Sequence, residues 1–542
     1  MAIAPVKDIT FRGANGTVPM SKLTEYSSYA DAQRHLTMER LGELFDGDES
    51  SLNIAHECID RYAADPVRIA IRIAHANGED EALTFRTVAD ASSRFAHELR
   101  ARGIVAGDRV AIMLEPSLPF YAALFGTMKC GAIAVPLFTA FGPDGIRLRL
   151  DDCTPRLLLT NTVKARELEG AISVETVIAD DAFMRGLERH PAEFETATAA
   201  GDLAVFQYTS GTTRELPAAI RHKHRAIVLV MIAGLYGTGI RPGDRYFCPS
   251  SPAWGHGLWH GTLAPLALGL ETGVYAGKFD PERLLRALHD YRTTNLSAAS
   301  THYRMMMLCG AAPKYTYSIQ KLTYTGEAID SDTLEFAKAT FGAEIGSIYG
   351  TTEVGVCLVC YPGADDLPIK PGSLGKPVPG VRVEVQNPAG EPSEPMEIGE
   401  IKVWRNDAWF PTKDLGYVDA DGYFYHAGRA DDVIISAGWT MSATEIEAAI
   451  LKHPAVQGAA VIAVPDPVRG QIAKAYVVAD RAGDDALVSE IQEFVRARLS
   501  RHEFPRAIVF VDELPKTPAG KINRKALRDR EAAAAELVSK GN

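Results

Sequence analysis

Apolar and polar residues alternate along the chain in two different periods, which together predict a repeated order of strands and helices. The segment 82–104, ALTFRTVADASSRFAHELRARGI, predicts a short strand followed by an amphipathic helix that ends at Gly103. A buried strand is predicted over 108–114, a helix over 119–131 and a further strand over 132–138. Strands that alternate with helices in this way are typical of βαβ units, which form parallel sheets covered by helices on both faces.

The alternation continues through the middle of the chain and then changes. LAVFQYT (203–209) predicts a strand and HRAIVLVMIAGLYGTG (224–239) a helix. Between about 363 and 428 the chain is rich in Pro and Gly, and the short stretches VRVEVQ, GEIKVW and GYFYHAG predict a small β-rich subdomain. We therefore expect an α/β protein with a large N-terminal domain, residues 1–430, made of parallel-type sheets flanked by helices. A small α+β C-terminal domain, residues 431–542, is expected to follow it.

Composition and charge limit the kind of partner. The 542 residues exceed what one compact core usually serves, and 46% of them are hydrophobic, as in ordinary globular proteins. The formal net charge of −12 argues against a general nucleic-acid binder, which needs a basic face. The sequence therefore favours small-molecule partners and no nucleic acid.

The sequence also contains indications of the cellular compartment in which the protein acts. The start, MAIAPVKDITFRG, is too polar for a signal peptide, and the most membrane-like run, 122–138, is interrupted by Lys129 and Pro136, so no membrane span is expected. The seven scattered cysteines predict free thiols in a reducing cytoplasm. Cys357 and Cys360 have CxxC spacing without a second pair nearby, so packing is favoured over a redox or metal role.

A possible phosphate loop follows the strand at 203–209. The run YTSGTT (208–213) places small hydroxyl residues and glycine between a predicted strand and a predicted helix, where backbone N–H groups can surround phosphate. Alone, the run is also compatible with a plain surface turn. It does not match GxxxxGK[ST], which excludes a P-loop NTPase interpretation.

Five further motifs follow in order: TYTGEAI (323–329), SIYGTTEVG (347–355), TKDLGYVDADGYFYHAGRADDVI (412–434), GWTMSATEIE (438–447) and LPKTPAGKINRKAL (514–527). With the YTSGTT loop they resemble the adenylate-forming superfamily, which contains acyl-CoA synthetases, peptide-synthetase adenylation domains and luciferases. The resemblance spans about residues 51–528. It implies that a carboxylate attacks the α-phosphate of ATP, and that a thiol, commonly CoA, then displaces AMP from the acyl-adenylate.

The resemblance also implies roles for individual residues. Thr352, Glu353 and Lys521 would be catalytic, with Glu353 holding Mg²⁺ and Lys521 carried by a mobile C-terminal domain that turns about Asp431. ATP would be bound by Thr209, Ser210, Gly211, Thr212, Thr213, Arg214, Gly326, Glu327, Ala328, Ser347, Ile348, Tyr349, Gly350, Thr351, Thr352, Asp414 and Arg429. CoA would pass Ser436, Ala437 and Gly438, and the acyl pocket would be lined by Trp254, His256, Trp259, Val354 and Gly355.

Plainer interpretations stand beside these roles. Glu353 is also compatible with a surface carboxylate, Lys521 with a solvated lysine, and Asp414 with Arg429 as an ordinary ion pair. His256 and His260 have the i, i+4 spacing of metal ligands, but no third ligand is apparent, so packing or a pocket role is favoured.

The chain departs from the family pattern at three places. Ala218 and Ala219 replace the Lys and Gly that usually follow the phosphate loop, Lys413 stands where glycine is usual, and Thr440 stands where many CoA ligases carry arginine. Our hypothesis is that Arg214 or Lys413 supplies the missing cation.

We therefore expect an AMP-forming carboxylate–CoA ligase that acts on an aromatic, alicyclic or medium-chain acid. A stand-alone adenylation enzyme that loads a carrier protein and a non-catalytic nucleotide-binding homologue are the alternatives. The expected partners are the acid, ATP and CoA, with a homodimer left open as the assembly.

Overall fold

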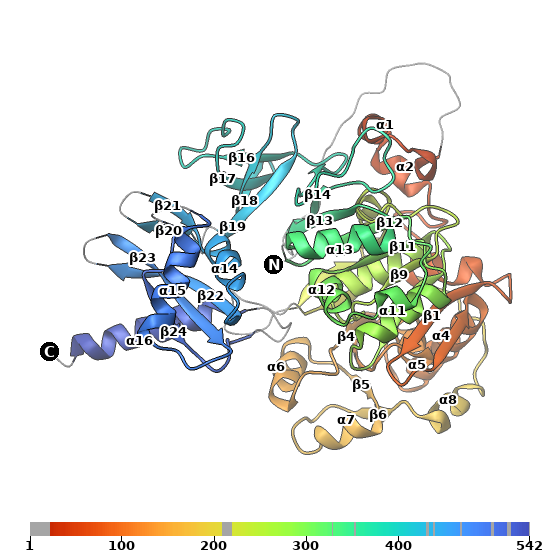
Figure 1. Ribbon diagram of the computed structural model, residues 1–542. Coiled ribbons are helices and arrows are strands. Elements are labelled where there is room, and N and C mark those ends of the chain that lie inside the picture. Colours follow the sequence, from red (N-terminus) through yellow and green to blue (C-terminus); the bar gives the residue numbers. More distant parts are fainter. Residues whose placement is uncertain are drawn as a thin grey trace. The chain divides into compact units, whose positions relative to one another are not determined.

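The structure is a computed structural model (Figure 1) that describes residues 22–208, 219–327, 329–351, 354–429, 433–436, 439–466, 469–499, 503–516 and 522–540. These residues divide into two compact units. The first contains residues up to 383 together with 404–408, and the second contains 384–403 and the residues from 409 onward. Among the described residues, no helix combines the length and the apolar character needed to cross a bilayer.

The larger sheet of the first unit has nine strands in the order β15-β14-β13-β12-β11-β9-β10-β1-β2. The strands are β1 (Ile69–His75), β2 (Asp80–Thr84), β9 (Tyr246–Cys248), β10 (Thr272–Ala276), β11 (Asn295–Ala299), β12 (Lys321–Thr325), β13 (Ile345–Thr351), β14 (Gly355–Val359) and β15 (Lys376–Pro377). The strands from β13 across to β1 are parallel, whereas β2, β14 and β15 are antiparallel to their neighbours.

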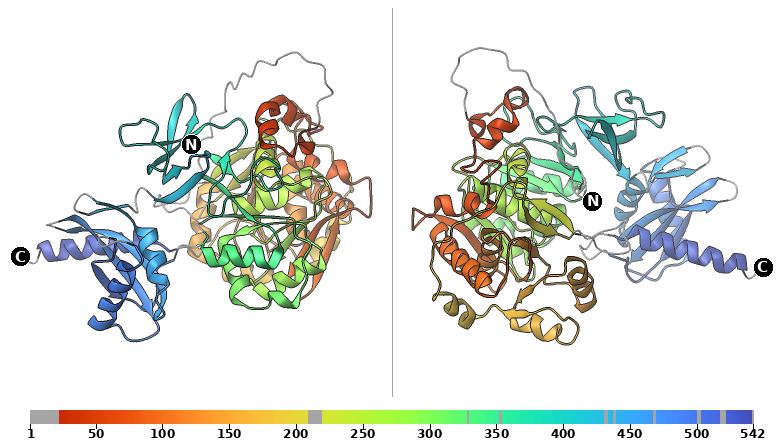
Figure 2. Two further views of the ribbon diagram at one scale, coloured as in Figure 1. Left: turned by 45° about the horizontal axis from the view of Figure 1, so that its top comes forward. Right: turned by 180° about the vertical axis from the view of Figure 1, so that it is seen from behind.

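Three helices cover one face of this sheet: α11 (Pro281–Asp290), α12 (Ser300–Leu308) and α13 (Ser331–Phe341). They lie together in Figures 1 and 2 and bury a shared apolar core with β9, β11 and β12. Two of them begin at an aspartate whose side chain accepts backbone N–H groups of the first turn, Asp280 for α11 and Asp330 for α13. These caps satisfy donors that a helix start otherwise leaves unpaired.

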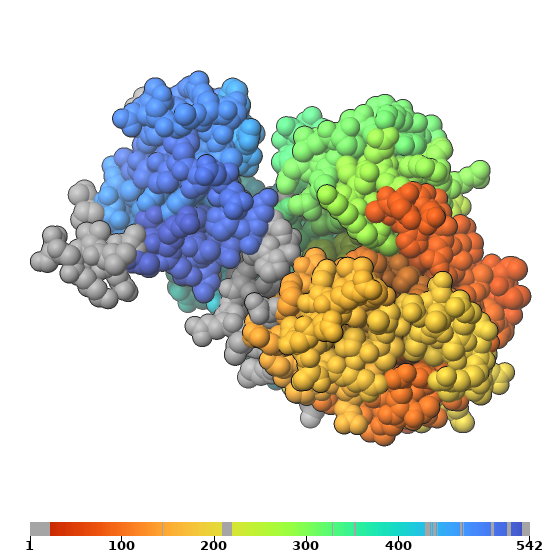
Figure 3. All heavy atoms as spheres, turned by 90° about the horizontal axis from the view of Figure 1, so that it is seen from below, coloured from red at the N-terminus to blue at the C-terminus, as the bar shows by residue number. Residues whose placement is uncertain are grey.

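The second sheet of the first unit has six strands in the order β6-β5-β3-β4-β7-β8, of which only β8 is antiparallel to its neighbour. Its strands are β3 (Arg109–Met113), β4 (Ile133–Pro136), β5 (Leu157–Thr160), β6 (Thr176–Ile178), β7 (Leu203–Gln207) and β8 (Ile220–Lys223). The helices along this part of the chain are α4 (Phe85–Ala101), α5 (Leu118–Lys129), α6 (Pro143–Cys153), α7 (Thr162–Glu167) and α8 (Asp181–Leu187). Figure 3 shows a recess between the green surface around α11–α13 and the orange-to-yellow surface of α6–α8.

The remaining helices of the first unit are mostly short. They are α1 (Tyr29–His35), α2 (Met38–Gly42), α3 (Ile54–Cys58), α9 (Ala226–Ile232) and α10 (Ala264–Ala267), with 3-10 turns at Leu23–Glu25, Asp60–Tyr62 and Ala312–Lys314. The helix expected over 224–239 begins as α9 but continues as a π-helix over Ala233–Gly237, and a second π-helix spans His256–Leu263. The two π-helices bury nearly every residue, whereas α9 buries only Ile227 and Met231.

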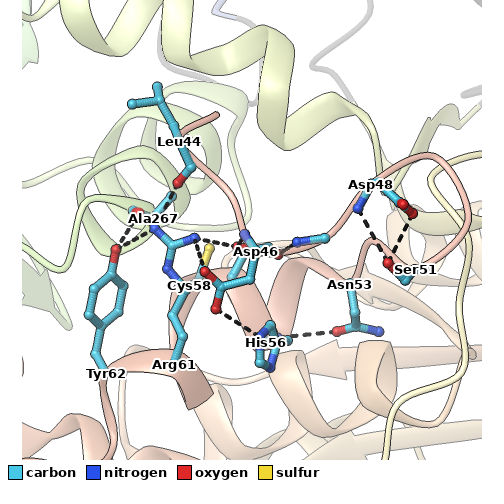
Figure 4. A network of polar contacts seen from close by, with 12 residues as sticks. Leu44, Asp46, Asp48, Ser51, Asn53, His56, Cys58, Arg61, Tyr62 and Ala267 are labelled. Carbon is cyan, nitrogen blue, oxygen red and sulfur yellow. Dashed lines mark hydrogen bonds and ion pairs between the residues drawn. The ribbon is translucent and has the colours of Figure 1, made fainter. Parts of the chain in front are cut away.

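Within the first unit, a polar network connects residues 44–47 to α3 and to the 3-10 turn that follows it (Figure 4). Glu57 is fully buried, accepts the backbone N–H groups of Asp46 at 3.1 Å and Gly47 at 2.7 Å, and pairs with Arg61 at 2.5 Å. The Arg61 guanidinium also donates to the carbonyl oxygens of Leu44 and Ala267. The buried charge is therefore paired and fully hydrogen-bonded, which is what makes its burial tolerable.

The second unit holds most of a four-stranded sheet, ordered β16-β17-β18-β19, and a five-stranded sheet ordered β21-β20-β23-β22 with β24 beside β23. The strands are β16 (Val383–Gln386), β17 (Gly399–Arg405), β18 (Ala408–Val418), β19 (Phe424–Arg429), β20 (Val433–Ser436), β21 (Trp439–Ser442), β22 (Val456–Asp466), β23 (Gly470–Ala479) and β24 (Ala507–Phe510). The helices are α14 (Ala443–Leu451), α15 (Asp485–Arg496) and α16 (Arg524–Lys540).

Alternation along β22 places helices on both faces of the five-stranded sheet. Ala459 and Val461 belong to the apolar core that contains residues of α14 and α15. Ala460 and Ile462 belong to the core that contains Leu527 of α16. Successive residues of a strand point to opposite faces, so one strand serves both cores. The boundary at residue 430 and the subdomain at about 363–428 stay predictions.

Candidate functional site

Seven of the residues predicted to bind the nucleotide lie at one edge of the nine-stranded sheet. Strands β9, β11, β12 and β13 are parallel neighbours, so their carboxyl ends meet at the same edge. Gly326 and Glu327 directly follow β12, whereas Ser347, Ile348, Tyr349, Gly350 and Thr351 form the last part of β13. Ligands of open α/β sheets bind at such an edge. The structure therefore brings these seven residues together.

Hydrogen bonds and close packing hold the residues at this edge of the sheet in place. The Thr325 hydroxyl donates to the carbonyl oxygen of Ile348 at 2.9 Å, and the Ser300 hydroxyl donates to that of Glu327 at 2.7 Å. Gly350 faces β14 so closely that a Cβ there would lie 2.1 Å from the Gly355 carbonyl oxygen. Among the described residues, Glu327 Oε1 and Thr351 Oγ1 are buried without a hydrogen-bond partner. Ala328, Thr352 and Glu353 lie outside the described residues.

The carboxylate of Asp152 accepts hydrogen bonds from the residues on either side of the predicted phosphate loop. Tyr208 follows β7 and Ala219 precedes β8, and these strands pair antiparallel. Asp152 Oδ2, on α6, accepts from the Tyr208 hydroxyl at 2.7 Å and from the Ala219 N–H at 3.1 Å. Burial raises the pKa of Tyr208, so the hydroxyl keeps its proton. The loop residues Thr209, Ser210, Gly211, Thr212, Thr213 and Arg214 lie outside the described residues. No sequence motif predicted a role for Asp152.

Three of the predicted acyl-pocket residues, Trp254, His256 and Trp259, lie in or just before the second π-helix. His256 is buried, and its Nδ1 and Nε2 lie 2.9 Å from the hydroxyls of Ser250 and Ser297. The Trp254 ring meets the His256 ring edge-on, with centroids 5.5 Å apart. Ser297 lies on β11, so His256 is held against the nine-stranded sheet. Gly355 is the first residue of β14 and the register partner of Thr351 on β13, and Val354 directly precedes it.

Trp259 connects this π-helix to the six-stranded sheet. Its indole N–H donates to Gln207 Oε1, on β7, at 3.0 Å. Its ring lies 4.7 Å, centroid to centroid, from that of His222 on β8. The predicted pocket residues therefore contact both sheets of the first unit.

Five histidines of this unit have lowered pKa values, and they are called the low-pKa histidines below: His222, His224, His256, His260 and His302. His224 and His256 are buried, whereas the other three are half-buried. Burial lowers the pKa of four of them to about 4, and lowers that of His256 well below the usual value with help from His260 and His302. The rings of His256 and His260 are 5.9 Å apart. Within the part of the chain that the structure describes, no group of three His, Cys, Asp or Glu side chains is placed to hold a metal ion.

The predicted ribose residues belong to the second unit. Asp414 on β18 and Arg429 on β19 are register partners of an antiparallel pair, and Asp414 is buried with Oδ1 3.6 Å from His426 Nε2. Lys413, beside it, has a left-handed φ of 62° and an exposed side chain. A left-handed conformation favours glycine, which explains why that residue is usual here. The strand β18 was not predicted from the sequence, because Pro411 and the left-handed residue Lys413 interrupt its alternation of apolar and polar residues.

The remaining predicted residues also fall in this unit. Ser436 ends β20, and its hydroxyl is buried without a hydrogen-bond partner among the described residues. Ala437, Gly438, the hinge residue Asp431 and the mobile lysine Lys521 lie outside the described residues.

Two helix-covered, mostly parallel sheets in the first unit, with a small β-sheet and an α+β part in the second, are the arrangement of adenylate-forming enzymes. The chain belongs to the AMP-binding enzyme family, whose model matches residues 60–407, and the model of the AMP-binding enzyme C-terminal domain matches residues 445–521. This result confirms the resemblance and the expected fold class.

Comparison with similar proteins indicates which type of adenylate-forming enzyme this chain is. An acetyl-coenzyme A synthetase of Bacillus subtilis (strain 168) is 31% identical, covering 88% of this chain and 90% of the relative. A 4-hydroxybutyrate–CoA ligase 1 of Metallosphaera sedula is 30% identical over 84% of this chain and 86% of the relative. The crystal structure of an anthranilate CoA ligase in complex with anthranoyl-AMP, 25% identical, has a TM-score of 0.79 over 92% of this chain and all of that one. The chain is thus an AMP-forming acid–thiol ligase of the acyl-CoA synthetase type.

Proposed function

We propose that this ligase converts an aromatic, alicyclic or medium-chain monocarboxylic acid to its CoA thioester through an acyl-adenylate. The observation that carries the proposal is the predicted acyl wall: Trp254, His256 and Trp259 are aromatic, and burial keeps the imidazole of His256 uncharged. A wall without charge suits an apolar acid tail better than a second carboxylate. The named relatives act on acids as different as acetate, 4-hydroxybutyrate and anthranilate, so kinship alone does not choose the acid.

The other roles follow the family resemblance. Thr352 and Lys521 act on the reacting groups, Asp414 and Arg429 bind the ribose, and Asp431 is the hinge that lets Ser436, Ala437 and Gly438 meet CoA. Glu353 would hold Mg²⁺, which would neutralise phosphate charge when bound. Because Glu353 lies outside the described residues, no step is routed through the metal. We further propose a cytoplasmic location, which the seven free thiols support, and a homodimer as an assembly to test by light scattering.

Product analysis tests this function. The purified chain is incubated with ATP, Mg²⁺ and a panel of acids, with and without CoA, and AMP, pyrophosphate and thioester are measured. We expect thioester and AMP with a subset of neutral-tailed acids, and loss of both in Lys521→Ala. Lys525→Ala is the matched control, because Lys525 is an exposed lysine whose ion pair among the described residues is with the surface carboxylate of Asp529, at 3.6 Å. Acyl transfer to a carrier protein but not to CoA would contradict the proposal.

The cation hypothesis has its own test. If Lys413 replaces the missing loop lysine, Lys413→Gly should raise the KM for ATP while relieving the left-handed strain, which stabilises the fold by about 1 kcal/mol. If Arg214 serves instead, Arg214→Ala should raise the KM for ATP and Lys413→Gly should not. An unchanged KM in both variants would refute the hypothesis.

A further inference from the structure

Two buried polar groups beside Trp259 lack hydrogen-bond partners. Gln207, the last residue of β7, is only 4% exposed, and its Nε2 is buried without a partner among the described residues. The Nε2 of His222, on β8, is buried and unpartnered in the same sense. Both side chains contact the Trp259 indole, one by the 3.0 Å hydrogen bond and the other by ring contact at 4.7 Å.

Trp259 sets the direction of the Gln207 amide. An indole N–H can only donate, so it requires the amide oxygen and turns the amide NH₂ group away from the ring. That NH₂ group offers two N–H donors. Gly255 packs along the same amide, since a Cβ there would lie 3.5 Å from Oε1. The amide is thus held in one orientation by its neighbours, with its donors unused.

Unused buried donors indicate a missing partner. Most buried polar atoms in folded proteins are hydrogen-bonded, and leaving one unpaired is costly, so a ligand or an ordered water is expected at such atoms. Burial keeps His222 uncharged, and Gln207 carries no charge. A carboxylate or an ammonium group would lose its hydration here without gaining an opposite charge. The group that fits is a neutral oxygen, which accepts from the amide and bonds to the imidazole.

We propose that Gln207 and His222 bind a neutral oxygen, a hydroxyl or a carbonyl, on the tail of the acid, which makes the preferred substrate a hydroxy- or oxo-monocarboxylic acid. The inference rests on the proposed function, because it requires Trp259 to line the acyl pocket. Gln207 directly precedes Tyr208 and the predicted phosphate loop, so an acid bound there has its tail beside the β7 edge. Gln207 and His222 are then specificity-determining residues rather than structural ones.

Matched acid pairs test the inference. The full chain is given pairs that differ by one neutral oxygen, such as an alkanoate and its ω-hydroxy or oxo counterpart, or benzoate and a hydroxybenzoate. The ratio of kcat/KM within each pair is measured from the CoA thioesters. We expect the wild type to favour the oxygen-bearing member of at least one pair by about ten-fold or more, because a site that hydrogen-bonds a substrate oxygen discriminates strongly against its absence.

Two independent variants should remove this preference. His222→Phe keeps a ring against Trp259 but removes Nε2, and Gln207→Met keeps the length of the side chain and a weak sulfur acceptor for Trp259 but removes the N–H donors. Each should bring the ratio to within about two-fold of unity by raising the KM of the oxygen-bearing acid, with the plain acid little affected. His224→Gln is the matched control: His224 is a buried histidine of the same segment that accepts the Ile54 N–H at 3.0 Å, so the ratio should not change.

The outcomes separate the two proposals. Thioester formation with a ratio near unity in the wild type, or with a ratio unchanged in both variants, would show that a buried water satisfies these atoms and would overturn this inference alone. Absence of thioester with every acid of the panel would overturn the proposed function, and this inference with it. A preference that both variants abolish and His224→Gln keeps would establish the inference.

Discussion

Removing the carboxylate of Asp152 should weaken ATP binding without affecting the acid. Asp152 Oδ2 accepts from the Tyr208 hydroxyl and from the Ala219 N–H, at the two ends of the predicted phosphate loop. In Asp152→Ala the Ala219 N–H loses this acceptor, and the Tyr208 hydroxyl keeps only the Arg149 carbonyl oxygen, at 2.9 Å, among the described residues. The link that Asp152 makes between the two ends of the loop is then lost, although β7 and β8 still pair. Because the loop is predicted to bind the β- and γ-phosphates, the KM for ATP should rise.

The magnitude follows from the two hydrogen bonds. A hydrogen bond to a charged group contributes about 1.5–3 kcal/mol where it is buried. Asp152 is exposed, so solvent screening reduces each bond to about 0.5–1 kcal/mol. Together they give about 1–2 kcal/mol, which corresponds to a rise of about five- to thirty-fold in KM if all of it is expressed in loop binding.

The assay follows pyrophosphate release against ATP at saturating acid and CoA, and then against acid at saturating ATP. Tyr208→Phe should show about half of the effect in free-energy terms, since it removes one of the two donors. Asp151→Ala is the control, because Asp151 is an exposed carboxylate on the same helix without a hydrogen bond or ion pair to the described residues. A folded Asp152→Ala enzyme with an ATP KM within two-fold of wild type, or with equal rises for ATP and acid, would refute the reasoning.

Three further predictions concern stability. Gly375→Ala should lower the free energy of unfolding by about 2–3 kcal/mol in urea denaturation, because φ is +81° and the new Cβ would lie 1.9 Å from the Val359 carbonyl oxygen. Gly372→Ala, with φ +74° and open space, should cost only about 1 kcal/mol. Glu57→Gln should cost about 2–3 kcal/mol in the same assay, since it leaves the Arg61 guanidinium without its buried carboxylate. Four of the low-pKa histidines have folded-state pKa values of about 4, and the pKa of His256 lies well below the ordinary 6.5, so only the unfolded chain gains protons as the pH falls from 6.5 toward 4. Above about pH 6.5 these histidines therefore contribute their full stabilisation to the fold. At lower pH the free energy of unfolding should fall by about 1.4 kcal/mol per pH unit for each histidine, as measured between pH 7.5 and pH 5.

Much of the first unit could be predicted, because its elements carry strong local patterns. The helix expected to end at Gly103 is α4, which ends at Ala101, and Gly103 takes the left-handed φ of 75° expected after a helix. The strands at 108–114 and 132–138 are β3 and β4, which pair in parallel as expected. Each depends on residues close in sequence, so its signal lies within a single window.

The site was predictable only where a motif marked it. Asp152 meets Tyr208 and Ala219 across 56 and 67 residues, and Gln207 meets Trp259 across 52. These contacts depend on how helices and sheets pack, and a single sequence carries no local signal for such pairs. The resemblance located the strand-edge residues Gly326, Glu327 and Ser347–Thr351, because there the chain keeps the family pattern. It did not indicate which groups hold them in place.

The uncharged acyl wall has a consequence for the source of positive charge. Adenylation brings a carboxylate to a triphosphate, so cations are needed to offset the negative charge that the two groups share. The low-pKa histidines cannot supply it near neutral pH, since burial holds their pKa values well below 6.5. The cations must then come from lysine or arginine, as the proposals for Lys521 and for Arg214 or Lys413 require. This division keeps the acid tail in a neutral site, where a hydrogen bond from Gln207 or His222 can discriminate between acids that differ by one oxygen. It also leaves the charge where the phosphates are, so variants of the acyl wall should change acid selectivity while the KM for ATP stays constant.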